Sequence, residues 1–246
     1  NPKLMNNVMA EIQLLLPCSV LEQQKIAEVL SCLDKAIEQT EAIIAKQQRV
    51  KTGLMQDLLT KGVDEQGNIR SEETHEFKDS PLGRIPVEWN TDTLENTCIK
   101  VTDGIHQKVK TSESGIPFLY VSCVRDGRIY WNRAANITPA TYKVISKGCE
   151  AIQGVILYTV VGSYGHAAIL KDNTQFGFER NIAYILPNTN KIFPDFLLYW
   201  LSSELIKTHA HTIALGNAQK LISLGSLSDY PQLLPSILEQ KRIVTI

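Results

Sequence analysis

SVLEQQKIAEVLSCLDKAIEQTEAIIAKQQRVKTGLMQDLLT, residues 19–60, decides the architecture of this 246-residue chain. The stretch has no proline and a single late glycine, Gly53, and its apolar residues recur at spacings of three and four. This periodicity predicts one continuous α-helix. Ser19 and Glu22 form the S-x-x-E pattern of a capping box, and Gly62 suits the end of the helix. About 40 residues at roughly 1.5 Å each predict a helix about 60 Å long.

The apolar stripe of this helix forms a heptad-like seam that one helix cannot bury by itself. Two interpretations stay open: the helix packs on its own domain, or the seam meets another long helix in the same subunit or in a partner. Thr40, Gln47 and Lys51 interrupt the seam, so they would weaken such a contact and fix its register. The residues predicted to face a partner helix are Leu30, Leu33, Ile37, Ile44, Leu54 and Leu58.

After the helix the composition changes twice. Residues 62–80, GVDEQGNIRSEETHEFKDS, are polar and turn-rich and predict a joint. Residues 81–235 carry short β-branched and aromatic runs, which predict strands at 116–124, 128–131, 155–161, 167–170 and 181–186, and an amphipathic helix at 194–209. These strands lie too close together in sequence for a regular parallel α/β fold. The predicted fold class is α+β: a mixed α/β domain plus a long coiled-coil-forming helix.

The chain repeats part of itself. LLPCSVLEQQKI at residues 15–26 returns about 218 residues later as LLPSILEQKRI at residues 233–243. Both copies carry the S-x-x-E pattern, so both are expected to start the same kind of helix. We therefore expect residues 1–18 to be the tail of a preceding copy of the globular part, residues 19–61 the long helix, and residues 236–246 the start of a second, truncated helix. On this interpretation the chain is a fragment or a half-length form.

Composition bounds the class of protein. With 43% hydrophobic and 21% charged residues, the chain is expected to be soluble and globular, and its apolar runs are too short to span a membrane. We expect it in the cytoplasm. The net charge of −1 gives no overall sign of nucleic-acid binding, although residues 81–246 hold 16 basic against 13 acidic residues. The five cysteines lack metal-ligand spacing and are expected to be buried free thiols.

Catalytic motifs are missing from the sequence. It holds neither the NPPY- or DPPY-type loop of a DNA adenine methyltransferase nor a glycine-rich loop for S-adenosylmethionine. The GxxxxGK[ST], HExxH and GxSxG patterns are also absent. We therefore expect no catalytic residues and no metal site.

Six segments, by their order and spacing, resemble the specificity subunit family of type I restriction-modification systems. They are KTGLMQDLLTKG, SPLGRIPVEW, GIPFLYVSCVRDGRI, FERNIAYILP, GNAQKLISLGSL and LPSILEQKRI. In that family two target recognition domains alternate with two long helices, which pack as an antiparallel coiled coil, and each domain reads half of a bipartite DNA site. The resemblance implies that this chain is one half of such a subunit, with residues 81–235 as the recognition domain.

The resemblance also implies partners. These are double-stranded DNA, methyltransferase subunits and restriction subunits, and a half-length member is expected to dimerise through its long helix. The chain itself is expected to need no cofactor, because S-adenosylmethionine, ATP and Mg²⁺ belong to the partner subunits. An adaptor or assembly module without base readout of its own is the alternative function.

Two loops are the first candidates for DNA contact. Asp103-Gly104 predicts a turn that presents His106, Gln107, Lys108 and Lys110, where a glutamine can bond adenine and lysine suits phosphate or guanine. In the second loop, Gly162 and Gly165 expose Ser163, Tyr164 and His166. An ordinary solvated loop and a purely structural turn are the respective alternatives.

Two polar clusters at the edges of apolar runs complete the candidates. Arg180 and Asn181 form one cluster, although Arg180 could instead pair with Glu179. Gln219 and Lys220 form the other, and the family resemblance places them near the DNA backbone.

Overall fold

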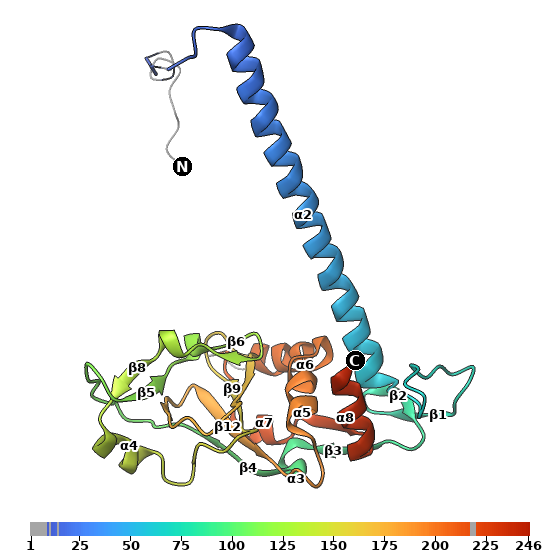
Figure 1. Ribbon diagram of the computed structural model, residues 1–246. Coiled ribbons are helices and arrows are strands. Elements are labelled where there is room, and N and C mark those ends of the chain that lie inside the picture. Colours follow the sequence, from blue (N-terminus) through green and yellow to red (C-terminus); the bar gives the residue numbers. More distant parts are fainter. Residues whose placement is uncertain (1–8, 10, 14, 217–219) are drawn as a thin grey trace. The chain divides into compact units, whose positions relative to one another are not determined.

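A computed structural model describes residues 9, 11–13, 15–216 and 220–246. The chain forms two compact units, Asn1–Lys51 and Thr52–Ile246 (Figure 1). Helix α2 spans Val20–Thr60 without a break, as its periodicity predicts. Short strands and helices make up the rest, so the α+β class is confirmed. The division into repeat tail, helix, joint, recognition domain and second helix stays a prediction.

The predicted seam divides into two parts along α2. Leu30, Leu33, Ile37 and Ile44 are between 55% and 63% exposed, and Leu54 is 37% exposed. Leu58 was predicted to face a partner helix, but it is 6% exposed and packs with Leu59 in the core of the second unit. The last turns of α2 therefore belong to the globular core, because their apolar side chains pack against other core residues of the second unit. Partner contact by the other seam residues stays a prediction.

The centre of the second unit is a four-stranded antiparallel sheet of order β10-β9-β12-β4. Its strands are β4 (Cys98–Asp103), β9 (Ile156–Thr159), β10 (Ala167–Ile169) and β12 (Ile182–Pro187). Along β9, Ile156 and Tyr158 face one core cluster, while Leu157 faces the other. Both faces of the sheet are thus covered, which explains why these strands are nearly continuous apolar runs rather than alternating ones.

Smaller elements surround this sheet. A three-stranded sheet contains β11 (Gly177–Phe178), β5 (Ile116–Leu119) and β8 (Ala135–Ile137). Three strand pairs are β1 (Phe77–Ser80) with β2 (Gly83–Pro86), β3 (Asn90–Thr93) with β13 (Pro231–Leu234), and β6 (Val124–Arg125) with β7 (Arg128–Ile129). Besides α2, the described residues form the α-helices α3 (Leu94–Thr97), α4 (Pro139–Ile145), α5 (Pro194–Leu201), α6 (Glu204–Leu215), α7 (Leu224–Ser228) and α8 (Ile237–Thr245).

Three sequence predictions need correction. The helix expected at 194–209 is two helices, α5 and α6, because Ser203 starts a new helix by accepting the Ile206 N–H at 3.3 Å. The strand expected at 116–124 is broken by a 3₁₀ turn at Val121–Cys123. Cys123 and Cys149 are buried as expected, but Cys18 and Cys32 are exposed.

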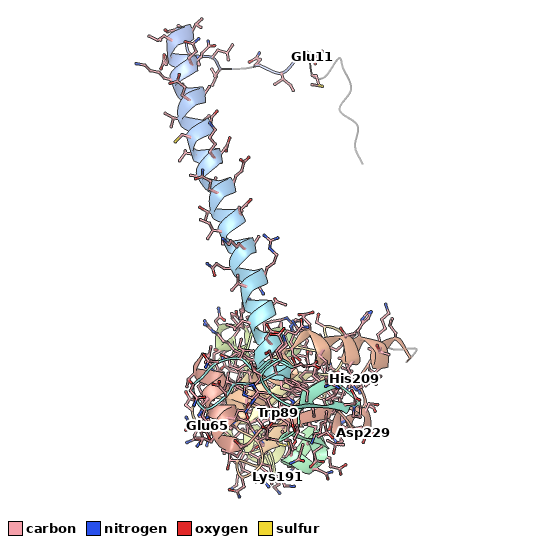
Figure 2. The ribbon with its side chains drawn as sticks, turned by 90° about the vertical axis from the view of Figure 1, so that its right-hand side faces the viewer. Glu11, Glu65, Trp89, Lys191, His209 and Asp229 are labelled. Carbon is pink, nitrogen blue, oxygen red and sulfur yellow. The ribbon has the colours of Figure 1, made fainter. Side chains whose placement is uncertain are left out.

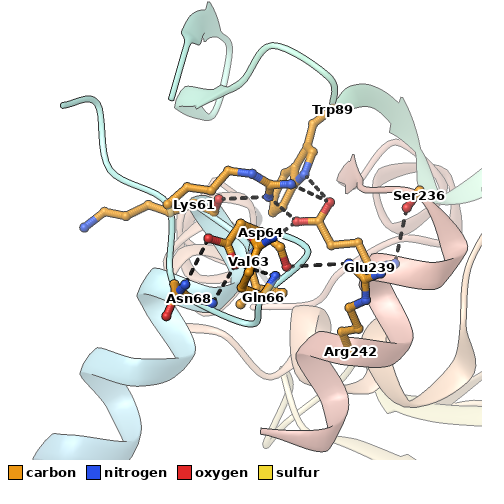
Figure 3. Close-up of polar contacts among 10 residues, drawn as sticks. Lys61, Val63, Asp64, Gln66, Asn68, Trp89, Ser236, Glu239 and Arg242 are labelled. Atoms are coloured by element: carbon orange, nitrogen blue, oxygen red, sulfur yellow. Dashed lines mark hydrogen bonds and ion pairs between the residues drawn. The ribbon is translucent and has the colours of Figure 1, made fainter. Parts of the chain in front are cut away.

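A buried carboxylate joins the residues after α2 to the start of α8. Glu239 accepts hydrogen bonds from the Val63 N–H at 3.1 Å and from the Trp89 indole at 3.2 Å, and pairs with Arg70 (Figure 3). Gly62, with a φ of +66°, lies so close that an added Cβ would collide with the Glu239 carboxylate and the Trp89 ring. The next residue of α8, Gln240, bonds the Phe193 N–H and the Lys191 carbonyl. We use the name socket for the five residues that bind the start of α8: Val63, Arg70, Trp89, Lys191 and Phe193.

This contact corrects the predicted capping box at the second helix. Ser236 does cap α8, because its Oγ accepts the Glu239 N–H at 3.2 Å. A capping box also requires the glutamate side chain to bond the backbone N–H of the capping serine. The Glu239 side chain makes no such bond to Ser236. It extends to the socket, where Trp89 is fully buried. Figure 2 labels Trp89 among the side chains of the second unit. The S-x-x-E pattern therefore encodes a tertiary contact as well as a helix start.

Candidate nucleic-acid interface

Three of the candidate segments meet at one edge of the central sheet because of its topology. Strand β12 is antiparallel to both β4 and β9, so its first residues lie beside the last residues of both neighbours. In the register, Ala183 pairs with Asp103, and Ile182 pairs with Thr159. The loop after β4, the turn after β9 and the segment before β12 must therefore emerge together.

Backbone hydrogen bonds tie the first loop to the segment before β12. The Ile105 N–H donates to the Phe178 carbonyl, and the Arg180 N–H donates to the Ile105 carbonyl, both at 3.1 Å. Gly104 makes this approach possible, because a Cβ there would collide with the carbonyl oxygens of Phe178 and Glu179. The contact sets the loop that carries His106, Gln107 and Lys108 against Arg180 and Asn181.

These segments enclose an open cleft of about 570 Å³. His106, Gln107 and Lys108 line one part of it, and Arg180 and Asn181 line another. Phe118 in β5 and Tyr120, the residue after that strand, also line the cleft. Sequence reasoning missed these two aromatic residues, since nothing in the β5 sequence marks them apart from other strand aromatics. Lys110 is exposed but does not line the cleft.

Some polar side chains at the cleft have partners within the protein, and others carry charges that no ion pair neutralises among the described residues. His106 Nε2 lies 2.8 Å from the Asp103 carboxylate. Glu179 accepts the Val121 N–H at 2.9 Å and the Asn181 amide at 3.3 Å. The alternative ion pair between Glu179 and Arg180 is not formed among the described residues. Within that part of the chain, Lys108, Lys110 and Arg180 also make no other ion pair, so their charges are available to an anionic ligand.

The turn after β9 lies next to this cleft. The Val160 N–H donates to the Asn181 carbonyl at 2.9 Å. Within the turn, Tyr164 shares a hydrogen bond of 2.9 Å with His211 Nδ1 of α6. His211 was also missed, because only the fold brings it to the turn. Ser163 is exposed, whereas His166 is half-buried.

Burial, and secondly the Arg125 charge, lower the pKa of His166 below its ordinary value. Its imidazole is therefore neutral at physiological pH. In that form it can donate or accept a hydrogen bond but adds no positive charge to the surface.

The last candidate cluster joins the same surface through a β-bridge between Val161 and Leu221. The Ile222 N–H also donates to the Val160 carbonyl at 2.9 Å. Lys220, next to this bridge, is exposed. Gln219 lies outside the described residues. The described candidate residues come from four separate segments. These segments form one connected group of loops at this sheet edge.

No protein-family model matches the chain, but comparisons with known proteins identify its relatives. It is 27% identical over 92% of its length to the MjaVIII specificity subunit of a type I restriction enzyme from Methanocaldococcus jannaschii, covering 52% of that protein. It is 28% identical over 94% of its length to the EcoBI specificity subunit from Escherichia coli, covering 50% of it. A putative MjaX specificity subunit of M. jannaschii is 31% identical over 69% of this chain and 41% of that protein.

Solved structures share the fold. The HsdS subunit from Thermoanaerobacter tengcongensis matches 92% of this chain and 49% of its own, with 19% identity and a TM-score of 0.52. The type I system S subunit from M. genitalium matches 92% of this chain and 53% of its own, with 15% identity and a TM-score of 0.53. A chain from a structure of type I R-M complex assembly and conformational transition matches 94% of this chain and 51% of its own, with 20% identity and a TM-score of 0.55.

The fold and the loops define a class of protein in which an α+β domain, with polar loops at one sheet edge, is joined to a long helix. The resemblance inferred from the sequence is confirmed: the chain is related to the specificity subunits of type I restriction enzymes. It spans about half the length of the curated relatives it matches. Among the described residues, no helix has both the length and the apolar character required to cross a bilayer.

Proposed function

We propose that the chain is the sequence-reading component for one half of a bipartite DNA target in a type I restriction-modification system. The observation that carries the proposal is the connected group of loops at one sheet edge, in a chain whose relatives are specificity subunits. Four segments between residues 103 and 220 contribute to this group. The adaptor alternative is not favoured, since the curated relatives are named for specificity.

The side chains of the interface suit two kinds of DNA contact. Lys108, Lys110, Arg180 and Lys220 carry exposed positive charges that can bind phosphates and fix the orientation of the domain. Gln107 and Asn181 carry carboxamides, the groups that bond adenine edges in the major groove. Glu179 supports the second role, because its hydrogen bond orients the Asn181 amide. We infer that charge supplies affinity and that the carboxamides in the cleft supply base preference.

The likeness to specificity subunits of type I restriction enzymes also suggests the complex in which the chain acts. The chain docks methyltransferase and restriction subunits, which carry S-adenosylmethionine, ATP and Mg²⁺, and it performs no catalysis itself. If it acts as a half-length subunit, the exposed seam of α2 pairs with the seam of a second copy and joins two half-sites. We place this complex in the cytoplasm, where its DNA substrate lies.

Binding by the assembled complex tests the function. The chain and the methyltransferase subunit of its own system are combined with duplexes of varied sequence, and affinity is measured at several salt concentrations. We expect one duplex family to bind more tightly by roughly a thousandfold or more, as specific protein–DNA complexes do. Equal affinity for all duplexes would overturn the proposed readout and favour the adaptor alternative.

A further inference from the structure

The two repeat copies show opposite burial. In the second copy, residues 233–243, five positions are buried: Leu233, Pro235, Glu239, Gln240 and Ile243. In the first copy, residues 15–26, Leu15 is fully exposed, and Glu22, Gln23 and Ile26 are also exposed. One copy of the repeated pattern is therefore packed into the second unit, and these residues of the other copy are exposed. We call residues 233–243 the resident segment and residues 15–26 the N-terminal segment.

The resident segment binds the socket through specific polar contacts. Glu239 accepts the Val63 and Trp89 N–H groups and pairs with Arg70. Gln240 accepts the Phe193 N–H at 2.7 Å and donates to the Lys191 carbonyl at 3.1 Å. Ile243 and Leu233 enter the hydrophobic core of the unit. A carboxylate, a carboxamide and apolar side chains at these spacings are what the socket recognises.

The N-terminal segment retains every one of these groups. The five buried positions of the resident segment correspond to Leu15, Pro17, Glu22, Gln23 and Ile26, which are identical in residue type. The differences fall at positions that are not fully buried. Ile237 corresponds to Val20, Lys241 to Gln24 and Arg242 to Lys25. The extra residue, Cys18, lies at the bend before the helix.

From the proline to the glutamine, the N-terminal segment also has the local conformation of the resident segment. Gln23 donates its side-chain amide to the Pro17 carbonyl at 2.8 Å, and Gln240 donates to the Pro235 carbonyl at 2.9 Å. In both copies the backbone N–H of this glutamine donates to the capping serine carbonyl, at 3.1 Å and 2.9 Å. The inserted Cys18 has not disturbed this turn. The segment is thus pre-organised, which lowers the entropic cost of docking.

We propose that the N-terminal segment of one copy of this chain can occupy the socket of a second copy, with Glu22 taking the place of Glu239. The occupant is a second copy because this chain itself supplies a socket that fits the sequence. The resident segment is held in place by its own chain at high effective concentration. Exchange therefore becomes favourable when the resident contact is weakened. The inference is independent of DNA readout, since the socket and the cleft share no residue.

The test compares the self-association of four versions of the 246-residue chain: wild type, Glu22→Ala, Glu239→Ala and the double variant. Sedimentation velocity over a range of concentrations measures the association constant, and circular dichroism confirms folding. Glu239→Ala weakens the resident segment but leaves the socket and Glu22 intact. We expect it to self-associate more tightly than the wild type by about tenfold or more, which corresponds to about 1.4 kcal/mol. The double variant should return to the wild-type value.

Any dimer through the α2 seam is common to all four chains and cancels from the comparison. Equal association of Glu239→Ala and the double variant would overturn the inference, as would no gain over the wild type. If Glu239→Ala fails to fold, a graft provides the test. Ile237→Val, Lys241→Gln and Arg242→Lys together place the N-terminal sequence in the resident position. We expect this graft to fold and melt within a few degrees of the wild type, whereas loss of the fold would show that the sequence does not fit the socket.

Discussion

Glu239 and Trp89 lie 150 positions apart in the sequence, yet the Glu239 carboxylate accepts the Trp89 indole N–H at 3.2 Å. Arg70 pairs with the same carboxylate, whose side chain is only 8% exposed. A carboxylate removed from water in this way needs its partners, because an unpaired buried charge is costly. The contact therefore fixes the start of α8 to the segment that follows α2.

Glu239→Ala should lower the free energy of unfolding by about 3 to 5 kcal/mol, because it leaves Arg70 without its buried partner. Trp89→Phe removes one donor to the carboxylate and should cost about 1 to 3 kcal/mol. Urea denaturation measures both. Glu65→Ala is the matched control, since Glu65 is exposed and its loss should change stability by less than about 0.5 kcal/mol. Equal effects of Glu239→Ala and Glu65→Ala would contradict the importance of the contact.

Gly104→Ala should loosen the loop that carries His106, Gln107 and Lys108. Its new Cβ meets the backbone carbonyls of Phe178 and Glu179, which cannot move as freely as side chains. We expect lower stability and weaker DNA binding by the assembled complex. Gly53→Ala is the control, because nothing lies within 4 Å of a Cβ at Gly53 in α2. That change should instead stabilise the protein by up to about 1 kcal/mol. Unchanged DNA affinity in Gly104→Ala would show that this loop does not contact DNA.

Lys108→Ala and Lys110→Ala should each weaken DNA binding without changing which sequence is preferred. Both lysines are exposed and charged, which suits phosphate contact. Each substitution should reduce the slope of log affinity against log salt by about 1. Lys35→Ala on α2 offers a control in an exposed part of the first unit. A salt slope equal to that of the wild type would place the two lysines away from the phosphates.

The cysteines should divide into two reactivity classes. Cys18 and Cys32 are exposed, whereas Cys123 and Cys149 are buried. Burial raises the pKa of the half-buried Cys98 thiol to about 12, so it carries almost no reactive thiolate at neutral pH. A colourimetric disulfide reagent should therefore titrate two thiols rapidly in the native protein and the rest only after denaturation. Loss of one rapid equivalent in Cys32→Ser serves as the control, and a rapid third thiol would be inconsistent with this burial.

Stability should fall as the pH drops below about 6.5. Burial lowers the pKa of both His166 and His209 from 6.5 in the folded protein. Below pH 6.5 the unfolded chain binds protons at these positions that the folded chain does not bind, so acid favours unfolding there. Replacing both histidines with asparagine should flatten this part of the profile. Denaturant midpoints at about pH 7.5 and pH 5.5 provide the measurement, and an unchanged profile in the double variant would argue against these two groups.

The sequence predicted elements better than it predicted contacts. The periodicity of residues 19–60 was sufficient to predict α2, because helical spacing is a local property. It could not show that Leu58 is buried by its own domain, since that depends on residues far away in sequence. The break at Ser203 was missed because the apolar pattern continues across it.

At the candidate site, too, the sequence predicted local features but not the contacts between them. The turn and charge patterns identified residues on four loops, but only the antiparallel pairing of β12 with β4 and β9 explains why these loops meet. Tyr120 and His211 carried no local signal that separates them from structural aromatic or helical residues. Glu239 did carry a signal, its match to Glu22 in the repeat, but the capping-box pattern offered a sufficient local explanation.

Selection of bound duplexes from a random DNA pool by the assembled complex tests the central claim most directly. The wild-type chain should enrich one short half-site, and Gln107→Ala and Asn181→Ala should each relax the preference at one or two base positions, by about 1 to 3 kcal/mol. Lys108→Ala should leave the enriched sequence unchanged. Enrichment of the same half-site by all four chains would contradict base readout by this cleft, and no enrichment by the wild type would contradict sequence recognition itself.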